Sequence, residues 1–138
     1  MIATIDKSIL IVESNTMFCE GLVKTFRSAN YNVFTASTGE DAFLLLRRQP
    51  HCINWLYSRA VLPGLIDGWV LADQYHEFCP NRQVVIAAHD ARFTAQGDIV
   101  LKEPTVAIVA ETIWALIRSE QLALTTATYD LGEHRRVA

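Results

Sequence analysis

Short apolar runs alternate with longer amphipathic stretches along most of this 138-residue chain. Each run is about five residues long, the length of a buried strand. The runs span Ser8–Val12, Tyr31–Thr35, Ile53–Ser58, Arg82–Ala88 and Ile99–Leu101. Strands of this kind separated by helices predict an α/β fold, doubly wound, with a five-stranded parallel sheet covered on both faces.

The stretches between the runs carry apolar residues at helical spacing. They predict helices over Met17–Ala29, Glu40–Arg48, Asp67–Phe78 and Thr105–Leu122. Asn15 or Thr16 is suited to cap the first helix and Asp67 the third, because their side-chain oxygens accept from free backbone N–H groups. Asn30 can end the first helix in the left-handed conformation.

Two segments lack a clear period. The polar stretch from His89 to Asp98 is interrupted by Gly97 and leaves room for at most about two turns of helix. The fourth helix of the pattern is therefore expected to be shortened. We interpret residues 1–122 as one domain and residues 123–138 as a flexible C-terminal tail, because mixed composition is typical of frayed ends.

Composition and charge mainly exclude functions. The net charge is −3, and the only basic pairs are Arg47-Arg48 and Arg135-Arg136, so nucleic-acid binding has no electrostatic support. No apolar run approaches the roughly 20 residues of a membrane helix, and the N-terminus lacks a signal-peptide pattern. Three distant cysteines, Cys19, Cys52 and Cys79, indicate reduced thiols. A cytoplasmic protein without a membrane segment is expected.

Four motifs in order resemble the receiver domains of bacterial two-component response regulators, over about residues 8–118. They are Ile9-Leu-Ile-Val-Glu-Ser14, Thr38-Gly-Glu-Asp-Ala42, Leu62-Pro-Gly64 with Asp67-Gly68, and Leu101-Lys-Glu-Pro104. The resemblance implies a flavodoxin-like fold. It also implies a site at the carboxyl edge of the sheet, where an acidic pair and an aspartate together bind magnesium. In the family, that aspartate accepts a phosphoryl group from a histidine kinase.

Position by position, the residues that the resemblance requires are mostly replaced. The acidic pair matches Glu13 and Ser14, and the phosphoacceptor matches Arg59. The hydroxyl position after the fourth strand is Ala87, or Ala88 in the next register. The lysine position is Glu103 and the switch-aromatic position is Val100. The chain therefore resembles a degenerate receiver, a pseudo-receiver.

These replacements remove the chemistry of the family. A guanidinium stays protonated and is no nucleophile, so Arg59 cannot accept a phosphoryl group. Magnesium prefers several oxygen ligands including carboxylates, and Glu13 is the one candidate, beside a cation. We expect no catalytic residue, no metal site and no cofactor, and the chain is not expected to be an enzyme. The dispersed histidines give no zinc ligand set.

Two replacements are complementary in charge. The acid has become Arg59 and the lysine has become Glu103, which predicts a charge-swapped ion pair between them, with Glu13 as a second acceptor. The alternative is that each side chain points to water. The resemblance further implies a cis peptide bond between Glu103 and Pro104.

Trp114 lies off the apolar stripe of the last helix, and Trp69 begins the third helix. Both are candidate interface residues, because exposed tryptophans anchor many protein contacts. With the resemblance, they favour a homodimer involving the last helix.

The leading hypothesis is a non-phosphorylatable single-domain response regulator that acts in signal transduction through protein–protein interaction with a sensor kinase or another regulator. The alternative is a sensor of a small anion or nucleotide, which would use the vacated phosphorylation pocket and the charge of Arg59.

Overall fold

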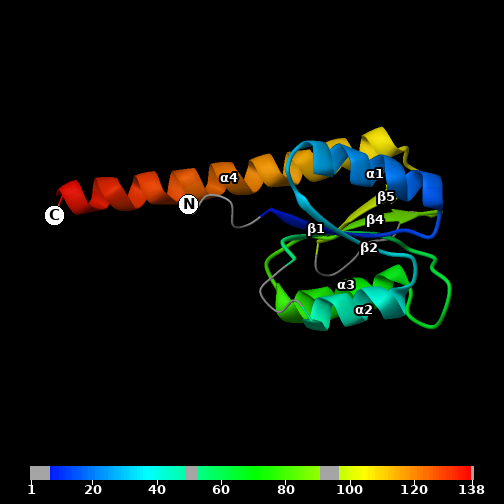
Figure 1. Ribbon diagram of the computed structural model, residues 1–138. Coiled ribbons are helices and arrows are strands. Elements are labelled where there is room, and N and C mark those ends of the chain that lie inside the picture. The colour runs from blue at the N-terminus through cyan, green and yellow to red at the C-terminus, as the bar shows by residue number, and fades with distance from the viewer. Residues whose placement is uncertain (1–6, 49–52, 91–96, 138) are drawn as a thin grey trace.

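Five parallel strands form one sheet with helices on both faces (Figure 1). The order is β2-β1-β3-β4-β5. The strands are β1 (Ser8–Val12), β2 (Asn32–Ala36), β3 (Trp55–Arg59), β4 (Val85–Ala88) and β5 (Ile99–Lys102). The computed structural model describes residues 7–48, 53–90 and 97–137, with side chains as far as residue 123. The predicted doubly wound parallel sheet is confirmed.

The helices are α1 (Thr16–Ser28), α2 (Gly39–Arg48), α3 (Gly68–Phe78) and α4 (Val106–Val137). Helices α1 and α4 cover one face of the sheet, and α2 and α3 cover the other (Figure 1). Successive side chains of a strand point to opposite faces, so each strand feeds two cores. In β3, for example, Leu56 packs toward α2 and α3, while Tyr57 packs toward α1 and α4.

The predicted helix ends are confirmed at three positions. The side chain of Asn15 accepts a hydrogen bond from the Phe18 N–H at 2.9 Å and caps α1. The side chain of Asp67 accepts from the Val70 N–H at 2.9 Å and caps α3. Asn30, just beyond α1, has a φ of 67°, the left-handed conformation that turns the chain toward β2.

Helix α4 is longer than the sequence pattern predicts. It runs to Val137 as one helix of 32 residues and projects beyond the sheet (Figure 1). The helix therefore continues past residue 122, where the sequence pattern predicts its end, and the flexibility of residues 123–138 stays a prediction. Residues 123–137 lack proline and contain several alanines and leucines, which are good helix formers. The shortened fourth helix is predicted within the stretch from His89 to Asp98, and residues 91–96 of that stretch lie outside the described residues.

Both tryptophans considered as interface anchors pack within the fold. The Trp114 ring lies 4.8 Å from the Phe26 ring and 5.4 Å from the Tyr31 ring, between centroids. Trp69 is partly buried against the core beneath α2 and α3. Part of the apolar surface of both rings is therefore used inside the domain, and an interface at these residues stays a prediction.

Candidate functional site

The candidate site lies where β1 and β3 end side by side. Val12 at the end of β1 is in register with Ser58 of β3, so the next residues, Glu13 and Arg59, come to the same edge. The Arg59 Nε atom donates to the Glu13 Oε2 atom at 2.5 Å. An ion pair therefore occupies the place where the resemblance would require a phosphorylated aspartate.

The Glu13 carboxylate is buried and accepts from three donors. Its side chain has no solvent-exposed surface, whereas that of Arg59 is 32% exposed. Besides Arg59, the Tyr57 hydroxyl donates to Oε1 at 2.7 Å and the Asn15 N–H donates to Oε2 at 3.0 Å. A charge-assisted bond of this kind is stronger than a neutral one and orders the β1–α1 turn.

The neighbouring ionisable groups respond to this carboxylate. The hydrogen bond from Arg59 to Glu13 raises the pKa of the guanidinium, so its charge is fixed. Burial, followed by the bond to Glu13, raises the pKa of the Tyr57 phenol. Burial and nearby Glu13 also raise the pKa of the Cys19 thiol, which keeps the thiol protonated.

An aromatic side chain from α1 completes the pocket. The Phe18 ring stacks on the Tyr57 ring with 6.2 Å between centroids and 16° between planes. The Arg59 guanidinium carbon lies 5.1 Å from the centre of the same Phe18 ring, within range of a cation–π interaction. Arg59 is thus held by a carboxylate and an aromatic face.

The predicted ion pair between Arg59 and Glu103 is wrong. The Glu103 carboxylate instead lies 3.0 Å from the His89 Nδ1 atom, and both side chains are mostly exposed. The sheet order explains the difference, because β3 lies between β1 and β4, whereas Glu103 follows β5. Glu13 on the adjacent strand is therefore the acceptor for Arg59, in the role expected of a second one.

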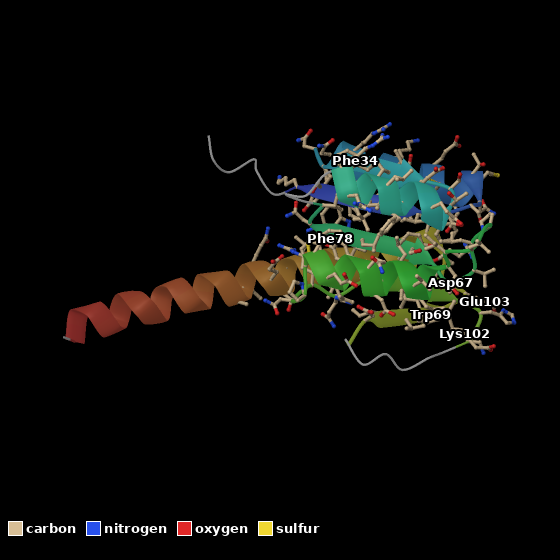
Figure 2. The ribbon with its side chains drawn as sticks, turned by 90° about the horizontal axis from the view of Figure 1, so that it is seen from below. Phe34, Asp67, Trp69, Phe78, Lys102 and Glu103 are labelled. Atoms are coloured by element: carbon tan, nitrogen blue, oxygen red, sulfur yellow. The ribbon has the colours of Figure 1, made fainter. Side chains whose placement is uncertain are left out.

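The peptide bond between Glu103 and Pro104 is trans, so the expected cis bond is also wrong. The turn after β5 is made differently, since Glu103 adopts a left-handed backbone with a φ of 43°. Its N–H donates to the Ala88 carbonyl at 2.9 Å. Figure 2 shows Lys102 and Glu103 at the same end of the sheet as Asp67 and Trp69, which begin α3.

The other positions named from the sequence lie on three different parts of this end of the sheet. Ser14 is exposed, Ala87 is buried on β4, and Val100 is half-buried on β5 beneath α3. Among the described residues, no group of three or more histidine, cysteine, aspartate or glutamate side chains is placed to hold a metal ion. The arrangement supplies a fixed cation and hydrogen-bond donors around a buried carboxylate.

Glu40 has a role that the sequence did not reveal. It lies in the first turn of α2, and its Oε2 atom accepts from the Leu65 N–H in the β3–α3 loop at 2.7 Å. This bond lowers the pKa of Glu40. Gly64 has a φ of 94°, and a Cβ added to it would lie 2.5 Å from a Glu40 carboxylate oxygen. The Thr38-Gly-Glu motif and the Pro63-Gly64 motif therefore meet and fix the loop.

Three large apolar side chains are exposed around this end of the sheet. Met17 at the start of α1 is 82% exposed, Val61 just after β3 is 76% exposed, and Leu65 in the same loop is 94% exposed. We call these three residues the apolar rim. Since β1 and β3 are adjacent, the segments that follow them flank the Glu13–Arg59 pair. The rim was not singled out by sequence because scattered apolar loop residues carry no period.

No family model and no curated protein matches this chain. Solved structures do. The response regulator receiver protein from Sinorhizobium medicae WSM419 has a TM-score of 0.73 at 21% identity, covering 84% of this chain and 98% of that one. The receiver domain of the hybrid histidine kinase CckA has a TM-score of 0.67 at 24% identity, covering 79% and 97%.

A CheY chain also matches, in a structure from Borrelia burgdorferi that contains CheX, BeF3 and magnesium. Its TM-score is 0.68 at 20% identity, covering 80% of this chain and 88% of that one. In the described part of the chain, no helix is long and apolar enough to cross a membrane. These similarities, which extend over nearly the whole length of each neighbour, establish that the chain has the flavodoxin-like fold of response-regulator receiver domains.

Proposed function

We propose that this protein is a receiver-like signalling module that acts through contacts with other proteins and is not phosphorylated at the Arg59 position. The similarity to receiver domains supports a role in response-regulator signalling. Sensor kinases or other regulators of a cytoplasmic two-component pathway are the partners that this role implies. Neither nucleic acid nor a membrane is part of the proposal, and no enzymatic activity is proposed.

The single observation that carries this proposal is the buried ion pair between Glu13 and Arg59. Phosphoryl transfer needs a carboxylate nucleophile and a cation that offsets the phosphate charge. At this site the carboxylate of Glu13 is already bonded by the guanidinium, the Tyr57 hydroxyl and a backbone N–H. A metal ion would have to displace Arg59 to reach Glu13, at the cost of an unpaired cation.

Contact with a protein is supported by the apolar rim around the pair. Exposed apolar side chains grouped at one place mark docking surfaces more often than isolated ones do. Met17, Val61 and Leu65 are exposed on the two segments that a partner would meet first at this end of the sheet. Glu40 holds the second of these segments in place, so the rim is presented by an ordered loop.

The alternative function, a sensor of a small anion or nucleotide, has weaker support. It requires a cation with unsatisfied charge in the pocket. The charge of Arg59 is instead met by Glu13, and its guanidinium lies against the Phe18 ring. A nucleotide would have to compete with a buried carboxylate for the same group. A homodimer is also a proposal. The surface proposed for it below does not include Trp69 or Trp114.

Two measurements on the full chain test the proposal. After incubation with acetyl phosphate and magnesium, intact-mass spectrometry is expected to show no added phosphoryl group, whereas an acyl phosphate would contradict the proposal. Capture of partners from the native cell is expected to recover a signalling protein. Val61→Asp combined with Leu65→Asp should abolish that capture, while Phe78→Asp, at the opposite end of α3, should not.

A further inference from the structure

Strand β2 is an edge strand with backbone groups that face away from the sheet. On the β1 side, Asn32 donates its N–H at 2.7 Å and Ala36 accepts through its carbonyl at 3.0 Å. Successive residues of a strand direct their N–H and C=O groups to opposite sides. Val33 and Thr35 therefore direct two donors and two acceptors toward the open edge, where another strand can pair.

The space beside this edge is hollow. Two grooves of about 600 and 500 Å³ adjoin it: the larger runs between α1, the end of β2 and α2, and the smaller runs between α1 and β2. Thr35 lines both. Phe34, in the middle of β2, lies by α2, on the far side of the molecule from Glu103 (Figure 2). An additional strand can therefore reach Val33 and Thr35 between the two flanking helices.

Acidic side chains lie at one end of the grooves and basic side chains at the other. On α1, Glu20 and Arg27 lie seven residues apart, and on α2 so do Asp41 and Arg48, a separation of about 10 Å along each helix. Both helices run back from the carboxyl edge of the sheet, so both acids lie near that edge and both bases near the other. All four are exposed, and the ion pairs found among the described residues involve none of them.

When a second copy lies alongside in the opposite direction, the acids of each copy come opposite the bases of the other. We propose that two copies of this chain pair through antiparallel β2 strands, forming one continuous ten-stranded sheet about a twofold axis. Val33 of each copy would exchange backbone bonds with Thr35 of the other, and Glu20 would face Arg27 across the interface. On the other face of the sheet, Asp41 would face Arg48 in the same way.

On the α2 side the centre of the proposed interface is apolar, whereas on the α1 side the exposed Lys24 lies there. Leu44 lies midway between the acid and the base of α2, lines the larger groove and is 50% exposed. A twofold axis through the middle of β2 brings Leu44 of each copy toward the other. Opposite charges at both ends of the two helices, with an apolar side chain midway along α2, favour a second copy as the occupant over an unrelated strand, which would need the same pattern. This inference does not depend on the proposed function.

Charge reversal tests the pairing directly. The full chain is expected to show a concentration-dependent dimer in sedimentation equilibrium. Glu20→Arg or Arg27→Glu alone places like charges opposite each other twice and should weaken the dimer by about tenfold, in line with the size of surface charge interactions. The double variant, Glu20→Arg with Arg27→Glu, should restore it. Single variants that dimerise like the wild type would overturn the proposal.

Backbone and location are tested separately. Thr35→Pro removes only an outward N–H and should weaken the dimer, whereas Thr35→Ala should not, with circular dichroism reporting whether each variant folds. With the native cysteines replaced by serine, Leu44→Cys should be cross-linked to its own copy by a short bismaleimide, and Leu65→Cys should not. A chain that remains monomeric at about 100 µM, or cross-links equally at both positions, would refute the proposed pairing.

Discussion

The Glu13 carboxylate lies wholly inside the protein and is bonded by the Arg59 guanidinium, which is one-third exposed. Glu13 comes directly after β1 and Arg59 ends the adjacent strand β3. They lie one residue beyond Val12 and Ser58, which are paired in register. Glu13 also accepts hydrogen bonds from the Tyr57 hydroxyl and from a backbone N–H. The pair therefore organises the end of the sheet. Its strength is the first property to measure.

Arg59→Met should destabilise the domain by about 2–4 kcal/mol, because it leaves a buried carboxylate without a cation. The loss should be smaller than the roughly 3–5 kcal/mol that breaking a fully buried ion pair costs, because Arg59 is partly solvated. Urea unfolding at pH 7 measures it. In the double variant Arg59→Met with Glu13→Gln the loss should be clearly smaller than the sum of the single losses. Additive losses would mean that the two side chains do not interact.

Arg59→Asp should not create a phosphorylation site, although it places an acid where the resemblance to receiver domains implies the phosphoacceptor. It places a second carboxylate beside Glu13, with no second metal ligand at Ser14 and no lysine at 103. Intact-mass spectrometry after incubation with acetyl phosphate and magnesium should show the unmodified mass. A phosphorylated single variant would mean that the lost side chains are dispensable, and Arg59→Asn is the matched control.

Glu103→Gly should stabilise the protein by about 0.5–1 kcal/mol. A left-handed residue other than glycine is strained by about 1–2 kcal/mol, and glycine gives part of this back through its flexible unfolded state. The exposed contact with His89 contributes little. Thermal unfolding measures the change. Lys102→Gly, in β5, should instead destabilise, and Glu103→Ala should stay near neutral because it keeps the strain.

Gly68→Ala should destabilise by about 3 kcal/mol, because the space is filled by backbone. A Cβ at Gly68 would lie 2.2 Å from the Arg59 carbonyl oxygen, so α3 would have to move from β3. Gly21→Ala is the control, since the atoms nearest to its Cβ would be the Val106 methyl groups at 3.2 Å, which are side-chain atoms, and alanine favours helix. Equal effects at both positions in urea unfolding would contradict this account.

Acid should loosen the loop that Glu40 holds. The Leu65 N–H lowers the pKa of Glu40, so this carboxylate stabilises the folded state above the unfolded value of 4.5, and the stabilisation is lost as the pH falls through the lower native value. Between neutral pH and that region, Glu40→Gln should show a smaller loss of stability on acidification than the wild type does.

The pattern of apolar runs was sufficient for the sheet and its helices, because burial on both faces leaves a period that sequence retains. The helix caps were also predictable, since Asn15 and Asp67 act on residues three positions away. The partner of Arg59 was not, because the choice between Glu13 and Glu103 depends on strand order and on a left-handed turn. The position of Trp114 likewise depends on Phe26 and Tyr31, which are distant in sequence.

The length of α4 has a mechanical consequence. Its first half is fixed against α1 and β4, and its second half stands clear of the sheet. At about 1.5 Å per residue the free part reaches some 25–30 Å outward, so a tilt of about 5° at the base displaces the tip by about 2 Å. A small change in packing at the base of α4 would thus produce a larger displacement at its C-terminal end, far from the Glu13–Arg59 pair.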